Sequence, residues 1–168
     1  MPNLTQPLRD EHRELLPQLE TVKDAADNVG EVTQEELQAK VTAALAFLRG
    51  HLIPHAQAEE AALYPAVARF LGSPMSTATM SVDHKMIMHG TGEVAEAAAH
   101  LPNADATQLR ALRTALYAVY AVTRVHFVKE EQVYLPLLDE KLDEASAKAM
   151  FEALETAAHE AKASAATA

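Results

Sequence analysis

The 168-residue chain contains no cysteine and no tryptophan, and it has only five glycines. The absence of cysteine excludes disulfides, thiolate nucleophiles, iron–sulfur clusters and sulfur-based zinc sites. Scarce glycine with abundant alanine favours helices, because alanine has the highest intrinsic helix propensity. No uninterrupted apolar run approaches the length that a membrane-crossing helix needs, so the sequence predicts no transmembrane span. The N-terminus, MPNLTQPLRDEHREL, has neither a basic region nor an apolar run. We therefore expect no secretory signal and a cytoplasmic location.

Positive charge is also in short supply. There are 14 lysines and arginines against 24 aspartates and glutamates, which gives a formal net charge of −10. This negative charge disfavours binding to nucleic acid or to an anionic membrane, but it does not disfavour binding to metal cations. The length allows one domain with a real core, and a hydrophobic content of 49% argues against disorder.

Apolar residues recur at three- and four-residue steps, which predicts amphipathic helices throughout. The predicted helices follow stripes from Leu8 to Val29, from Leu37 to Phe70, from Met80 to Ala98, and from Leu109 through Val133 to Leu137. Four long helices with short connections predict an all-α, antiparallel, up-down-up-down four-helix bundle over residues 1–142. A weaker helix over residues 143–168 is expected to pack on the outside, with a frayed tail. Pro17 and Pro54 should kink the first two helices.

Each of the four stripes carries a histidine between its apolar residues, and two stripes add a glutamate one turn later. These residues are His12, His55, Glu59, His84, His126 and Glu130. A single histidine on an apolar stripe is usually a hydrogen-bonded core residue. Two buried carboxylates, however, cost several kcal/mol unless they are compensated, and no lysine or arginine occupies an equivalent position. The pattern therefore predicts a metal site, since His and Glu at i and i+4 project from one helix face.

The ligand types limit the choice of metal. Nitrogen and carboxylate donors without sulfur suit iron, manganese or zinc. Six ligands exceed the four of a tetrahedral zinc ion, but they fit two ions bridged by two carboxylates. The ligand set is also repeated, because each half of the chain supplies one histidine and then a His-x-x-x-Glu motif at nearly the same offset. His12, His55 and Glu59 recur as His84, His126 and Glu130. We interpret the site as a redox-active di-iron pair, with zinc and manganese left open.

These residues lie in four motifs whose order and spacing are specific: LRDEHREL, HAQAEEAALYP, SVDHKMI and HFVKEEQVYLP. In them the chain resembles the hemerythrin-like family, often called HHE cation-binding proteins. The resemblance implies a non-haem di-iron site inside a four-helix bundle. It implies that Glu59 and Glu130 bridge the two iron ions, together with an oxo or hydroxo group. The four histidines then become terminal ligands.

The sequence departs from the pattern of the oxygen-carrying hemerythrins. Those proteins have a second histidine one turn after the first on the third helix, where this chain has Met88. The nearby His89 is rotated by about 140° from His84 on an ideal helix. The carriers also bridge through an aspartate five residues after the last histidine, whereas Glu130 is four residues after it. His51, one turn before His55, is a further candidate, so His51 and His89 are possible additional ligands.

Several neighbours of the six residues have two possible roles. Glu60 and Glu131 point about 100° away from the preceding glutamates, which favours a solvated or supporting position. Tyr64 and Tyr134 lie roughly one turn past those glutamates, where their hydroxyls either hydrogen-bond the site or pack at the bundle end. Met88 lines the pocket or serves only in packing.

Three classes of function fit these residues. The protein binds O2 or NO reversibly, or it is an enzyme that processes peroxide or NO, or it handles iron or holds metal structurally. A ferritin-like oxidase is excluded, because no Glu-x-x-His pair lies on the stripes. Fewer protein ligands leave more open positions, so we expect a protein that reacts with O2, NO or peroxide. The sequence does not decide between binding and catalysis. The expected partner is a small diatomic molecule or peroxide, with the protein a monomer or weak homo-oligomer.

Overall fold

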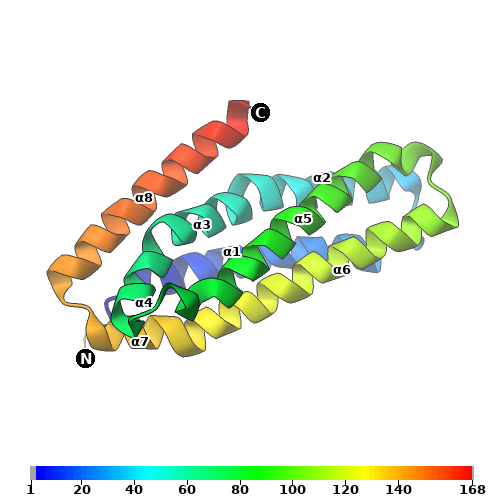
Figure 1. Ribbon diagram of the computed structural model, residues 1–168. Helices are drawn as coiled ribbons and strands as arrows, with labels where there is room; N and C mark the ends of the chain where they lie inside the picture. The colour runs from blue at the N-terminus through cyan, green and yellow to red at the C-terminus, as the bar shows by residue number, and fades with distance from the viewer. Residues whose placement is uncertain (1–2, 168) are drawn as a thin grey trace.

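The computed structural model describes residues 3–167 and shows four antiparallel helical segments that form a bundle (Figure 1). The segments are α1 (Gln6–Asp27); α2 (Gln34–Phe47), α3 (Ile53–Ala58) and α4 (Tyr64–Leu71); α5 (Ala78–His100); and α6 (Ala106–Lys129) with α7 (Leu135–Lys141). Helix α1 packs against α2 and α6, and α5 packs against α6, α2 and α3. No strand occurs between residues 3 and 167. The predicted all-α four-helix bundle is confirmed.

The ends of the helices follow from local sequence signals. Thr33 accepts a hydrogen bond from the backbone N–H of Glu36, and the Glu36 side chain accepts one from the N–H of Thr33. Asp105 and Gln108 form the same capping box before α6. Each box satisfies backbone donors that have no partner within the helix. Gly72 ends α4 with a φ of 71°, a left-handed conformation that glycine adopts without steric cost.

Three turns of the bundle are π-helical, and each lies just before a proline. They span residues Leu48–Leu52, Glu59–Leu63 and Glu130–Tyr134. In each case the residue before the proline donates its N–H to the carbonyl five residues back, as Tyr64 does to Glu59. A proline has no N–H, and its ring crowds the carbonyl four residues back. The wider turn removes this conflict, so the helical segment continues past Pro54, Pro65 and Pro136.

The wider turns also shift the buried face of the segments that follow them. Val133 and Phe70, both expected on the buried stripes, are exposed by 56% and 36%. After the turn that begins at Glu130, Tyr134 and Leu135 are buried instead. An i→i−5 turn contains one residue more than an α turn. The regular 3.6-residue period therefore places the wrong residue in the core there.

The apolar interior consists of two clusters with the polar residues between them. On α1, His12 lies between Leu8 of one cluster and Leu15 of the other. On α5, His84 lies between Met80 and Ile87 in the same way. The candidate ligands thus form a polar layer between the two apolar clusters of the bundle.

Helix α8 (Glu144–Thr167) packs against α3 and the turn at Glu59–Leu63 (Figure 1). It contributes Met150 and Leu154 to the second apolar cluster. The tail over residues 162–168, expected to fray, is helical through Thr167, and Ala168 lies outside the described residues. The division into residues 1–142 and 143–168 stays a prediction. Between residues 3 and 167, no helix is long and apolar enough to cross a membrane.

Candidate metal centre

The six predicted ligands come together in the polar layer of the bundle. They are exposed by 4% or less, and Glu59 and Glu130 are fully buried. Each glutamate is the first residue of a π turn, at 59–63 and 130–134. π turns inside α-helices are frequent at functional sites. The sequence feature that widens the helix is therefore the same one that positions the two carboxylates.

Glu59 lies between two pairs of histidines. Its Oε1 is 3.1 Å from Nε2 of His55 and 3.9 Å from Nε2 of His12. Its Oε2 is 3.3 Å from Nε2 of His84 and 3.7 Å from Nε2 of His126. One carboxylate thus offers an oxygen to each pair. We name the place beside His12 and His55 the first position, and the place beside His84 and His126 the second position.

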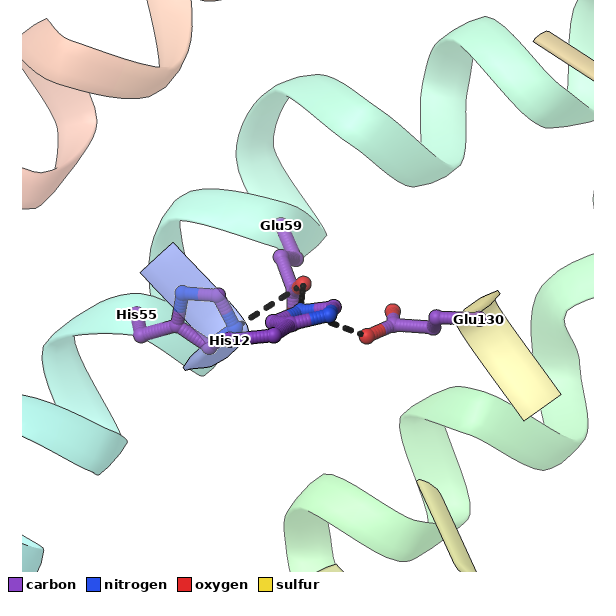
Figure 2. Close-up of side chains that lie close together, drawn as sticks. All are labelled: His12, His55, Glu59 and Glu130. Carbon is purple, nitrogen blue, oxygen red and sulfur yellow. Dashed lines mark ion pairs between the residues drawn. The ribbon is translucent and has the colours of Figure 1, made fainter. Parts of the chain in front are cut away.

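Glu130 approaches the same two positions from another helix. Its Oε2 is 3.4 Å from Nε2 of His12, and its Oε1 is 3.5 Å from Nε2 of His126. Figure 2 shows His12 and His55 turned towards Glu59, with Glu130 reaching in from the other side. Both carboxylates therefore span the two positions.

Several inward-facing atoms have no hydrogen-bond partner among the described residues. They are Nε2 of His12, Nε2 of His55, both carboxylate oxygens of Glu59 and Oε2 of Glu130. A buried polar atom without a partner costs about 1–3 kcal/mol, so such atoms are rare in native proteins. Two adjacent donor atoms bound to one ion at about 2.1 Å lie about 3 Å from each other. The distances between the carboxylate oxygens and the Nε2 atoms are close to this value. The residues present therefore fit a pair of metal ions.

The other ring nitrogen, Nδ1, of each of the four clustered histidines meets a carboxylate from a neighbouring segment. The distances are 3.1 Å for His55 to Glu11, 2.9 Å for His84 to Glu60, 3.1 Å for His126 to Asp83, and 2.8 Å for His12 to Glu131. A carboxylate can only accept, so each Nδ1 carries the proton and donates it. This fixes the ring and leaves Nε2 free to bind a metal ion.

The four carboxylate–histidine pairs form a closed ring around the bundle. Each of the first three segments supplies a carboxylate that contacts Nδ1 of the histidine on the next segment. The fourth segment supplies the carboxylate that contacts the histidine on the first. Two of the carboxylates are held in turn by cations. Arg9 lies 2.6 Å from Glu131, and Lys129 contacts Asp83. Each imidazole orientation is therefore set by a different helix from the one that carries it.

Two members of this ring were not predicted from the sequence. Glu11 and Asp83 directly precede His12 and His84, at equivalent places in the two halves of the chain. This repeated position is the sequence signal that could have identified the two residues. The supporting position predicted for Glu60 and Glu131 agrees with their contacts to His84 and His12, although each is still partly exposed.

Protons compensate the buried carboxylates when no cation is bound. Burial lowers the pKa of His12, but Glu130 and Glu59 outweigh this effect and raise it to about 9. Burial likewise opposes the charge on His55, yet the carboxylates of Glu59 and Glu11 raise the pKa of that residue well above its usual value. The neighbouring imidazoles also hold the pKa of Glu59 low in spite of its burial. A metal ion must therefore displace protons from these histidines.

Tyr64 extends its hydroxyl into the second position. Its Oη is 3.2 Å from Nε2 of His84, 3.2 Å from Nε2 of His126 and 3.1 Å from Oε1 of Glu130, to which it donates. Burial, with the charges of Glu59 and Glu130, raises the pKa of Tyr64 far above its ordinary value. The hydroxyl of Tyr134 instead donates to the backbone carbonyl of Ser76.

The remaining candidates lie away from the cluster. The side chain of His89 is 79% exposed, and its Nε2 lies 3.7 Å from a carboxylate oxygen of Glu93. Helix α5 is a regular α-helix at this point, so His89 points to a different side of the helix from His84. His51 is exposed and its ring stacks near Phe47. Met88 is 39% exposed. The structure does not bring any of these three to the ligand atoms.

Two cavities adjoin the histidines of the first position. One of about 520 Å³ lies between α1, α3 and α8, and it is lined by His55, Glu11, Leu8, Phe151 and Leu154 among others. The other, of about 340 Å³, is bordered by His12, Arg9 and Arg13. Small molecules therefore have room to approach this side of the cluster.

A comparison with known families agrees with this geometry. The family model described as "Hemerythrin HHE cation binding domain" matches residues 3–138. The matched range contains the six candidate ligands, the four supporting carboxylates and Tyr64, and it ends before α8. No curated protein and no solved structure matched the chain. The family match and the buried His/Glu cluster together indicate metal binding.

Proposed function

Because this chain belongs to the hemerythrin HHE cation-binding family, we propose that it is a non-haem di-iron protein that binds or reacts with O2, NO or peroxide. The observation that carries the proposal is the division of the buried donors into two groups. One consists of His12, His55, Glu59 and Glu130, and the other of Glu59, His84 and His126. A carboxylate shared between two groups of donors can bridge a pair of ions.

Iron is the metal that we infer for this site, because its redox chemistry suits the proposed partners, while zinc and manganese stay open. Nitrogen and carboxylate donors without sulfur are compatible with iron, manganese and zinc. A structural zinc ion usually takes four ligands in a tetrahedron, whereas these donors span two positions through two carboxylates. Two ferrous ions can together supply two electrons to a small oxidant, which suits O2, NO or peroxide as the partner.

The protein's own residues bind, orient and shield the pair. The four imidazoles ligate through Nε2 because Nδ1 is engaged by the ring of carboxylates. The apolar clusters pack on both sides of the polar layer, and the six candidate ligands are exposed by 4% or less. Tyr64 holds a proton on Oη next to Glu130 in the ligand-free protein.

Reactivity is favoured over simple reversible carriage. The fifth histidine of the oxygen carriers has no counterpart in the cluster, because Met88 and His89 both lie on the exposed side of α5. A position without a protein ligand is available to an external molecule. The cavity of about 520 Å³ beside His55 has room for a small reductant or substrate. A peroxide- or NO-processing enzyme is therefore the second candidate.

The decisive experiment is metal analysis followed by spectroscopy. The protein, expressed with iron supplied and purified, should hold about two irons per chain. Its absorption spectrum should change on addition of O2 or peroxide to the reduced form, and its electron paramagnetic resonance should change with NO. Repeated turnover of peroxide or NO would identify an enzyme. The proposal fails if no transition metal is bound, or if zinc alone fills the site in iron-replete cells.

A further inference from the structure

The two halves of the metal centre are not equivalent, and the difference lies at Tyr64. The internal repeat that relates His55 to His126 also relates Tyr64 to Leu135, which is fully buried. Tyr134 falls opposite Leu63, one place away from the equivalent position. One half of the site therefore offers a hydroxyl oxygen where the other offers only an apolar side chain.

The π turn explains why Tyr64 faces the cluster. Its N–H bonds to the carbonyl of Glu59, five residues back, which places Tyr64 one widened turn beyond that ligand. Tyr134 is only four residues beyond Glu130, and it points to the carbonyl of Ser76. Position five after the glutamate faces inwards in both halves, as the complete burial of Leu135 shows.

The distances around Oη are those of neighbouring ligands on one ion. The oxygen lies 3.1–3.2 Å from three donor atoms, on His84, His126 and Glu130. The two imidazole nitrogens are themselves 3.0 Å apart. Donors bound at about 2.1 Å to one ion stand roughly 3 Å from each other. The hydroxyl oxygen thus lies where a further ligand of the same ion would lie.

Hydrogen bonding alone does not account for this position once metal is bound. Each Nδ1 donates to a carboxylate, so the lone pair of each Nε2 is directed to the ion. Neither Nε2 atom can then accept a hydrogen bond from the phenol or donate one to it. An oxygen 3.2 Å from both nitrogens is best placed to share their ion.

We propose that the hydroxyl oxygen of Tyr64 is a protein ligand of the second metal position, held there with His84 and His126. The inference rests on the proposed function, because it requires metal ions at the centre. Coordination replaces the phenol O–H bond with an oxygen–metal bond, and the proton leaves to solvent. The cation stabilises the phenolate in spite of its burial. The open place for an external ligand then falls on the first position, which adjoins the two cavities.

The test is the visible and resonance Raman spectrum of the iron(III)-loaded full-length protein. Phenolate bound to iron(III) gives a charge-transfer band in the visible region, and excitation in that band enhances tyrosine ring vibrations. We expect this band in the wild-type protein, with Raman modes that shift when the tyrosines carry ring deuterium. This measurement needs no variant, so it does not depend on how a substituted protein folds.

Tyr64→Phe should lose the band while still holding iron, and Tyr134→Phe should keep it. Tyr64→His, which restores a donor, should bind iron without the band. Two irons per chain with no phenolate band in the wild type would overturn the ligand assignment alone. A band that persists in Tyr64→Phe would also overturn it. Absence of bound iron in the wild type would instead overturn the proposed function on which the inference rests.

Discussion

Glu59 and Glu60 are adjacent in the chain, but they have different partners. Glu59 is fully buried and faces both histidine pairs, whereas Glu60 holds Nδ1 of His84 and is partly exposed. Glu130 and Glu131 repeat this arrangement, with Glu131 on His12. The first residue of each pair therefore faces the inward Nε2 atoms of the cluster, and the second contacts Nδ1 of one imidazole.

Substitution should separate these two roles. Glu59→Ala or Glu130→Ala should abolish the paired site, because each removes a carboxylate that spans both positions. Glu60→Ala or Glu131→Ala should weaken metal binding about 10–100-fold, the usual effect of removing a support behind a ligand. The number of metal ions per chain, and the metal affinity measured in competition with a chelator, distinguish loss of the site from weakened binding. Equal loss in all four variants would contradict the assignment.

A second prediction concerns pH. The pKa of His12 is raised from 6.5 to about 9 in the ligand-free fold. A group with a raised pKa stabilises the fold fully below its unfolded value and loses that contribution as pH rises through its folded value. The metal-free protein should therefore lose stability between pH 6.5 and about 9. Metal binding, which displaces protons, should strengthen across the same range.

The measurement is the melting temperature of both forms against pH. The difference between the metal-loaded and metal-free forms should widen as pH rises through this window. His89→Ala serves as a control, because the side chain of His89 is 79% exposed and lies outside the cluster. A metal-free melting temperature that stays constant or rises over this range would count against proton compensation at His12.

The burial of the six candidate ligands could be predicted from the sequence because each interrupts an apolar stripe with a polar side chain. Helical periodicity alone places such a residue in the interior. The carboxylates behind the histidines could not be found in this way. Glu11 and His55, for example, are on different helices, so their contact depends on how α1 and α3 are rotated against each other.

At the scale of the element, the helical segments were predictable but their local widening was not. Capping and turn residues mark the ends, as at Thr33 and Gly72. The prolines at 65 and 136 were visible in the repeated motifs. Each proline shifts the backbone hydrogen bonding of the preceding turn, and this shift depends on how the helix packs. Helix propensities and a fixed 3.6-residue period therefore do not predict the π turns. The exposure of Val133 follows from that single extra residue.

Helix α8 supplies a prediction at the same scale. Leu154 is 7% exposed, belongs to the apolar cluster next to the metal centre, and lines the cavity beside His55. Leu154→Ala should lower stability by about 2–5 kcal/mol and widen the approach to the first position. A small chelator should then remove iron faster than from the wild type.

The exposed residue Glu152, on the same helix, gives the matched control. Glu152→Ala should leave the melting temperature and the chelation rate close to those of the wild type, since its side chain is 67% exposed. If Leu154→Ala destabilises the protein but leaves the chelation rate unchanged, α8 supports the fold without controlling access to the metal.

At the scale of the whole molecule, metal and fold should be coupled. Removing the ions leaves two carboxylates and four imidazoles facing one another between two apolar clusters. Ions that bind only the native state stabilise it by about 4 kcal/mol when the free ion concentration is about 1,000 times the dissociation constant. The metal-free protein should therefore melt clearly lower than the loaded form, as followed by circular dichroism. Identical melting of both forms would separate the ions from the folded core.

The internal repeat of the ligand motifs also bears on how such a centre can change over evolutionary time. Two identical helix pairs joined as a symmetric dimer would place the same residue on both sides of the axis, so one mutation would alter both ion positions together. A single chain that encodes both halves is free of that constraint. Position 64 can carry tyrosine while position 135 carries leucine. Each half can then diverge independently, which allows one ion to be held more fully and the other to be left for chemistry.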